Sequence, residues 1–191
     1  MKTITLLSAS ALILAIGLSA LSDLKNQKIP NSITFSLALF GLAYHAFNNG
    51  LPGIFLSFMG LFTGVAIFIV PYILGGMGAG DAKLMGGIGT VLGPKGVFIT
   101  GILSVFIGFI YAIILLAIHS NYGISFFKRS AIAVKTFFFT RQWIYIPPES
   151  EEKRPTLCYA LPIALGTLIY IYLKATGSTL IQDLLGIRFS L

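Results

Sequence analysis

The chain has 191 residues, of which 56% are hydrophobic and only 10% are charged, and its mean hydropathy is +0.91. Because a soluble domain carries roughly 25% charged residues, this chain cannot cover itself with a polar surface, and it is predicted to be an integral membrane protein. The formal net charge of +7 indicates contact with anionic lipid headgroups and not nucleic acid, since no basic run is interleaved with aromatic residues.

Six apolar segments follow one another along the chain, and a transmembrane helix needs about 20 such residues. The second and fourth segments are short for a full crossing. We nevertheless predict an all-α, polytopic bundle of about six transmembrane helices that forms one domain over residues 1–191. In chain order, the segments are residues 4–21, 33–47, 53–74, 82–92, 96–118 and 156–174. The tail, residues 177–191, is expected to lie at an interface.

The first segment also has a second interpretation. Residues 1–20 have a basic start, an apolar core and a small-residue end, which is typical of a secretory signal peptide. The apolar run is long for a signal, and basic residues follow it closely. These features favour a retained first helix.

The distribution of lysine and arginine sets the orientation of the bundle. With the N-terminus outside, the cytoplasmic side collects nine basic residues and the other side keeps four, which satisfies the positive-inside rule. We therefore predict an N-out, C-out chain whose residues 120–155 form a cytoplasmic loop. The nine are Lys25, Lys28, Lys83, Lys128, Arg129, Lys135, Arg141, Lys153 and Arg154; the four are Lys2, Lys95, Lys174 and Arg188.

Only six acidic residues exist, and four of them fit a solvated role: Glu149, Glu151, Glu152 and Asp183. The other two, Asp23 and Asp81, lie at the ends of the first and fourth segments, 58 residues apart but both at the predicted cytoplasmic boundary. Each alone is explained as well by an interfacial helix cap as by function. Two ionisable residues at one membrane depth indicate a functional site.

Two carboxylates within hydrogen-bonding range would share one proton and titrate as a unit. One can then take a proton from water while the other polarises a carbonyl group, as in aspartic proteases. Gly78 and Gly80 flank Asp81, and glycine permits unusual dihedral angles and close approach of an extended substrate. Peptide hydrolysis by this scheme would need no metal or other cofactor.

Other chemistries lack their motifs. The sequence has no His-Glu-x-x-His, no Gly-x-Ser-x-Gly and no P-loop, and the single Cys158 excludes an internal disulfide. His45 and His119 are expected to be interfacial. The small-xxx-small runs "GLFTG" (60–64) and "GTVLG" (89–93) predict close helix packing.

Two motifs resemble those of prepilin peptidases. "SDLKNQKIPN" (22–31) is similar to the family's first aspartate motif, and "GAGDAKLMGGIG" (78–89) to its Gly-x-Gly-Asp motif. "CYALPIALG" (158–166) is weakly similar to a Pro-Tyr segment of the last span, with Cys158 where proline is expected. The methyltransferase region of large members, with its paired Cys-x-x-Cys motifs, is not found here. The chain therefore resembles the short, peptidase-only CpaA/TadV-like branch, although archaeal preflagellin peptidases are of similar size.

The resemblance implies that Asp23 and Asp81 are the catalytic dyad and that Gly78 and Gly80 shape the loop of the second aspartate. It also implies a membrane aspartyl endopeptidase that removes the short basic leader of pilin-like precursors at the cytoplasmic face of the bacterial inner membrane. Lys83 would not share the helix face of Asp81, so it either tunes the local field or binds lipid headgroups. The sequence leaves homo-oligomer formation open.

Two other functions use the same acids. A proton-coupled transporter would relay protons through them, but transporters usually bind their substrates near the bilayer midplane. A non-catalytic subunit of a secretion assembly is expected to have lost one aspartate, and this chain has both.

If the two carboxylates alone activate water, a chelator will not change activity. We expect EDTA to leave the rate of leader removal from a co-reconstituted pilin precursor unchanged, as measured by a mobility shift on gels. Loss of cleavage that returns when a divalent metal is added back would contradict the metal-free mechanism.

Overall fold

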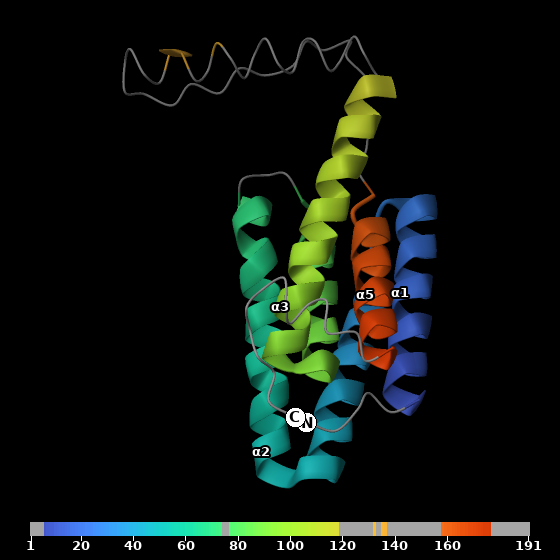
Figure 1. Ribbon diagram of the computed structural model, residues 1–191, viewed down its shortest axis with the longest axis vertical. Helices are drawn as coiled ribbons and strands as arrows, with labels where there is room; N and C mark the ends of the chain where they lie inside the picture. The colour runs from blue at the N-terminus through green and yellow to red at the C-terminus, as the bar shows by residue number, and fades with distance from the viewer. Residues whose placement is uncertain (1–5, 74–76, 119–131, 133–134, 137–157, 177–191) are drawn as a thin grey trace. The chain divides into compact units, whose positions relative to one another are not determined.

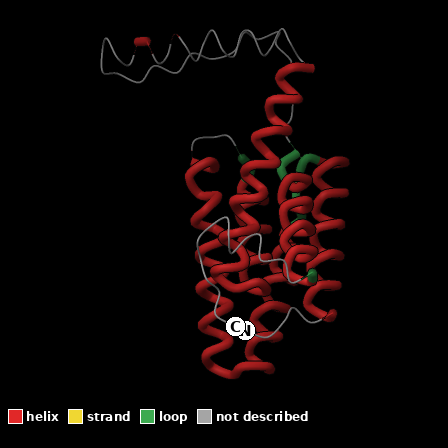
Figure 2. The backbone as a smooth tube through the Cα atoms, viewed as in Figure 1, coloured by secondary structure: helices red, strands yellow, loops and turns green. Residues whose placement is uncertain are grey.

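A computed structural model describes residues 6–73, 77–118, 132, 135–136 and 158–176, and these contain helices and no strand (Figures 1 and 2). The helices are α1 (Leu6–Asn26), α2 (Asn31–Ile73), α3 (Ala79–Ile118) and α5 (Ala160–Ala175). The predicted all-α class is confirmed. The chain divides into two units, Met1–Gly108 with Cys158–Leu191 and Phe109–Leu157, and the buried apolar cluster lies within the first.

Within the described residues, three helices are long and apolar enough to cross a membrane: α1, α2 and α3. The shorter α5 is also apolar. Large side chains such as Leu14, Phe35 and Phe62 are more than half exposed, which is the pattern of a surface that faces lipid and not water. These features fit a multi-pass membrane protein. The predicted loop, residues 120–155, and the tail, residues 177–191, lie almost entirely outside the described residues.

Both long helices are interrupted where the sequence predicts a boundary between segments. Gly50 (φ 61°) breaks α2 ahead of Pro52, and Gly93 (φ 74°) breaks α3 ahead of Pro94. Glycine adopts positive φ without steric cost, and proline cannot donate the main-chain hydrogen bond that would continue a helix. The two breaks divide α2 and α3 into segments that correspond to four of the predicted spans, with α1 and α5 as the others. The number of membrane crossings stays a prediction.

Side chains of α2 contact the carbonyl groups of α3 just before its break at Gly93. A helix leaves its last carbonyl groups without main-chain donors, and such groups need partners inside a membrane protein. The Ser57 hydroxyl donates to the Thr90 carbonyl oxygen at 2.9 Å, and His45 Nε2 lies 3.0 Å from the Val91 carbonyl oxygen. That contact requires the Nε2–H tautomer of His45. His45 therefore connects the part of α2 before Gly50 to the part of α3 before Gly93.

Glycines bring α2 and α3 into main-chain contact. A Cβ atom added at Gly60 would overlap the carbonyl group of Gly89, one added at Gly89 would overlap that of Gly60, and one added at Gly64 would overlap that of Met85. The packing predicted for the small-xxx-small runs is confirmed.

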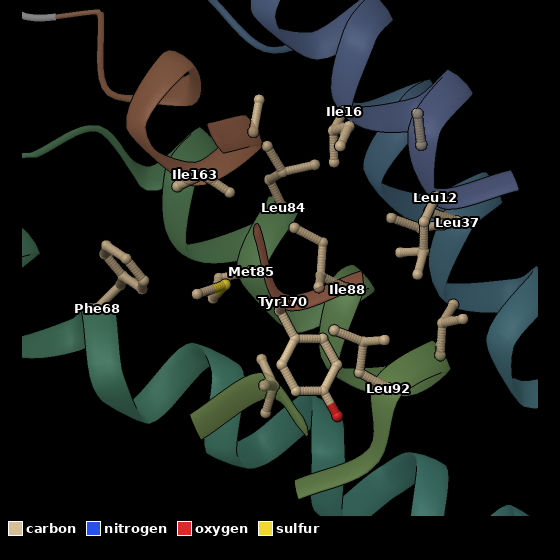
Figure 3. Packing of buried hydrophobic residues seen from close by; sticks show 14 of the residues in the cluster. Leu12, Ile16, Leu37, Phe68, Leu84, Met85, Ile88, Leu92, Ile163 and Tyr170 are labelled. Carbon is tan, nitrogen blue, oxygen red and sulfur yellow. The ribbon is translucent and has the colours of Figure 1, made fainter. Parts of the chain in front are cut away.

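All four helices contribute to one buried apolar cluster (Figure 3). The helix α1 also packs directly against α2 and α5 (Figure 1). The largest fully buried side chains include Leu12 and Ile16 of α1, Phe68 of α2, Leu84, Met85 and Ile88 of α3, and Ile163 of α5.

We expect Gly60→Ala to lower the melting temperature in detergent by several degrees, because the added methyl group forces α2 away from α3. Gly17→Ala is the matched control: a Cβ at Gly17 meets no atom within 4 Å, so this variant should be as stable as the wild type or more so. Equal melting temperatures for the two variants would contradict the close contact.

A candidate two-carboxylate site

Asp23 lies in the last turn of α1, and its side chain is 8% exposed. The helix ends just after it, because Gln27 adopts a left-handed conformation (φ 52°) and donates its N–H to the Asp23 carbonyl oxygen at 2.8 Å. A carboxylate at the C-terminal end of a helix is disfavoured by the helix dipole. Asp23 therefore needs stabilisation from elsewhere in the bundle.

That stabilisation comes from the N-terminus of α5. The Ala160 N–H donates to Asp23 Oδ2 at 3.2 Å. The N-cap residue of α5, Tyr159, makes no side-chain capping hydrogen bond, so the carboxylate of Asp23 caps α5 from another helix. The favourable interaction of Asp23 with the dipole of α5 thus offsets its unfavourable interaction with the dipole of α1.

Asp81 is the third residue of α3, and its side chain is 7% exposed. Its Oδ2 accepts the Gly78 N–H at 3.2 Å, and its own N–H donates to the Gly78 carbonyl oxygen at 3.2 Å. This reciprocal pair resembles a capping box, in which an acidic side chain satisfies the N–H of the N-cap residue. The sequence interpretation of Asp81 as a helix cap is therefore correct at the level of hydrogen bonding.

The structure brings Asp23 and Asp81 together. Their carboxylates are close enough to interact electrostatically, although 58 residues separate them along the chain. Both are buried, and each accepts a main-chain N–H at the start of a helix. Two buried acids from distant parts of the chain thus lie within electrostatic range of each other.

Gly78 and Gly80 fit the site through their lack of side chains. Neither has positive φ; among the described glycines only Gly50 and Gly93 do, so the unusual dihedral angles expected at Gly78 and Gly80 are not observed. A Cβ at Gly78 would lie 3.3 Å from Asp81 Oδ2, and one at Gly80 would lie 3.2 Å from Ile29 Cβ. Gly78 therefore leaves room beside the carboxylate, and Gly80 lets the connection between α1 and α2 pack against α3.

Lys83 contacts the first turn of α2. It is exposed, and its Nζ donates to Asn31 Oδ1 at 3.1 Å. This contact joins the first turn of α2 to the first turns of α3, so residues of the two sequence motifs touch each other. The sequence did not anticipate the pairing, because two polar side chains 52 residues apart carry no sign that they meet.

Cys158, Tyr159 and Ala160 stand at the start of α5, and the first and last of them contact Asp23. The sequence contained little indication of this role. The Cys158 thiol donates to the Asp23 carbonyl oxygen at 3.7 Å, and the Tyr159 hydroxyl donates to the Ser104 carbonyl oxygen at 3.5 Å. Burial, and then the carboxylates of Asp23 and Asp81, raise the pKa of the Cys158 thiol. The weak similarity of "CYALPIALG" was the available signal for this region.

Among the residues that the structure describes, no three His, Cys, Asp or Glu side chains gather as a metal site would require. The chemistry that this arrangement offers is proton transfer between two carboxyl groups and a third reactant.

Comparison with protein-family models matches residues 9–113 to the type IV leader peptidase family (Peptidase A24). The matched region is more than half of the chain and contains both aspartates. Searches of curated proteins and of solved structures found no match.

The single cysteine reports on the site without any substrate. Asp23→Asn and Asp81→Asn should each lower the pKa of the Cys158 thiol by removing a neighbouring negative charge, and so raise the thiolate fraction at a fixed pH. We expect alkylation by iodoacetamide at pH 8 to be about threefold to tenfold faster, as measured by mass spectrometry. Glu151→Gln, which removes a carboxylate from the predicted loop, is the control. Unchanged rates in both aspartate variants would contradict the proximity of the three groups.

Proposed function

This chain belongs to the type IV leader peptidase family, and we propose that Asp23 and Asp81 are its catalytic dyad. Family membership makes it a protease, and the substrates that the family implies are pilin-like precursors. The observation that carries the proposal is the pairing of two buried carboxylates from distant motifs, each oriented by a main-chain N–H.

In the proposed reaction the dyad carries one proton. Two carboxylates that interact closely in a poorly solvated site do not both hold a full negative charge, so they bind a proton between them. The ionised carboxylate accepts a proton from water as the water oxygen attacks the scissile carbonyl carbon. The protonated partner donates its proton to the carbonyl oxygen.

Collapse of the tetrahedral intermediate breaks the C–N bond. The carboxyl group that took the proton from water then passes it to the leaving amine, and the other recovers its proton from the intermediate's hydroxyl group. The dyad ends in its starting state with one proton, and the products are a leader peptide with a new carboxyl terminus and a shortened pilin with a new amino terminus. Every proton is thus accounted for by the two side chains and one water molecule.

The main-chain donors have a defined part in this scheme. Ala160 N–H and Gly78 N–H each donate to one oxygen of a carboxylate, which restricts the rotation of both side chains. Fixing catalytic groups before the substrate binds removes an entropic cost from the transition state. Gly78 adds space at Asp81, where a side chain would crowd the carboxylate.

The proposed orientation places the site at the cytoplasmic face of the inner membrane. Nine basic residues fall on that side and four on the other when the N-terminus is outside. The apolar stem of a pilin precursor would lie in lipid beside the exposed apolar helix faces, with its basic leader at the headgroups and the scissile bond at the depth of the dyad. The exposed Lys83 lies at the same end, where it can contact headgroups.

We further propose that the pilin-like substrates of this chain are of the Flp type, as in the CpaA/TadV-like branch of the family that its motifs resemble.

We expect Asp23→Asn and Asp81→Asn each to abolish leader removal, by at least about a thousandfold, because an amide cannot exchange the proton that the reaction needs. The measurement is co-expression with a pilin precursor and separation of precursor from mature pilin on a gel. Asparagine keeps an acceptor oxygen for the Ala160 or Gly78 N–H, so both variants should still insert and fold.

Glu151→Gln is the matched control for the loss of one carboxylate and should cleave at the wild-type rate. Substantial cleavage by either aspartate variant, at wild-type membrane levels, would exclude the dyad.

A further inference from the structure

The connection between α1 and α2 is held against the start of α3 by two contacts that flank Asp81 in the chain. The side chain of Ile29 packs at Gly80, where an added Cβ atom would lie 3.2 Å from Ile29 Cβ. Just after the connection, Asn31 Oδ1 accepts the hydrogen bond from Lys83 Nζ at 3.1 Å. Since Asp81 lies between Gly80 and Lys83, a movement of the connection relative to α3 is resisted on both sides of this aspartate.

The same connection, residues 27–30, is also tied to the last turn of α1, which carries Asp23. The Gln27 N–H donates to the Asp23 carbonyl oxygen, and the Ser22 hydroxyl donates to the Lys28 carbonyl oxygen at 2.9 Å. A displacement of the connection would therefore displace the end of α1 as well. The main chain of one aspartate is thereby linked to that of the other through the connection.

Helix stability does not explain why Lys83 pairs with Asn31. Asn31 is the first residue of α2 and Lys83 is the fifth of α3, so the ammonium group lies near the N-termini of two helices. The helix dipole disfavours a cation at this position and favours an acidic side chain. Both residues are exposed, so neither is needed to fill the core. The pairing therefore calls for an explanation other than the stability of either helix.

We propose that Asn31 and Lys83 are positioning residues of the peptidase, and that their hydrogen bond sets the separation of the dyad's two carboxylates. The inference rests on the proposed function, because it concerns the dyad. Two carboxyl groups share a proton only when they are close, and their interaction energy falls as the distance between them grows. A hydrogen bond from a charged donor is stronger than one between neutral groups, which suits it to hold this distance.

The kinetic experiment uses the full-length chain in nanodiscs with a pilin precursor that the wild type cleaves. We expect Asn31→Ala and Lys83→Met each to lower kcat about fivefold to tenfold with KM unchanged, because the dyad loosens while the contacts with substrate stay. Since both variants break the same bond, the double variant should be no slower than either single variant. Lys83→Arg keeps a charged donor and should restore at least about half of the wild-type kcat.

Two matched controls lie in the last turn of α1. Asn26→Ala removes an exposed asparagine whose side chain makes no hydrogen bond in the described part of the chain, and Lys25→Met removes an exposed positive charge. Both should cleave at the wild-type rate. A kcat within about twofold of the wild type in Asn31→Ala would overturn the proposal, even if Lys83→Met is slow, because Lys83 would then act through its charge alone. Effects that multiply in the double variant would overturn it as well.

A second measurement needs no cleavage. Infrared difference spectra between the wild type and Asp23→Asn isolate the carboxyl bands of Asp23, and the shift that Asp81→Asn causes in these bands measures the interaction between the two groups. We expect Asn31→Ala and Lys83→Met to reduce this shift to about half or less, and Asn26→Ala to leave it unchanged. An equal shift in all three backgrounds would overturn the proposal, whereas failure of the wild type to cleave any precursor would overturn the proposed function alone.

Discussion

A carboxylate buried in a membrane protein must find hydrogen-bond donors inside the protein, and this requirement organises the bundle. Asp23 and Asp81 find theirs in main-chain N–H groups at the starts of α5 and α3. A helix can offer these groups only at its N-terminus, where the first N–H groups have no partner within the helix. The last turn of α1 and the first turns of α3 and α5 must therefore meet at one level, and the packing of the other residues keeps them there.

The breaks at Gly50 and Gly93 shape the packing of α2 against α3, the helix that carries Asp81. They redirect both long helices, and the carbonyl groups that the second break exposes are satisfied by Ser57 and His45. Gly60 and Gly89 then allow main-chain contact between α2 and α3. The position of Asp81 thus depends on residues far from it in sequence, and small changes at the glycines would move the carboxylate without touching it.

The sequence predicted those features that side-chain type and spacing encode. The apolar runs predicted the helical class and the segment boundaries at which the breaks fall, and counting acids paired Asp23 with Asp81. The sequence could not predict that Ala160 is the donor to Asp23. Every residue except proline has an N–H group, and only the fold decides which of them lies near the carboxylate. The contacts of Lys83 with Asn31 and of Gly80 with Ile29 could not be predicted either, because each joins residues more than 50 positions apart that only the fold brings together.

Helix capping and catalysis make compatible demands on the two aspartates. A cap requires an acceptor oxygen held at a helix N-terminus, and an acid–base pair requires carboxyl groups held in fixed orientations. One N–H bond to each carboxylate meets both demands, and it also offsets part of the repulsion between two acids in a poorly solvated site. The cap interpretation, which explains either residue alone, is thus part of what the proposed dyad needs. What capping does not explain is the convergence of two such acids, because each helix start could be capped by a neutral serine or asparagine at lower electrostatic cost.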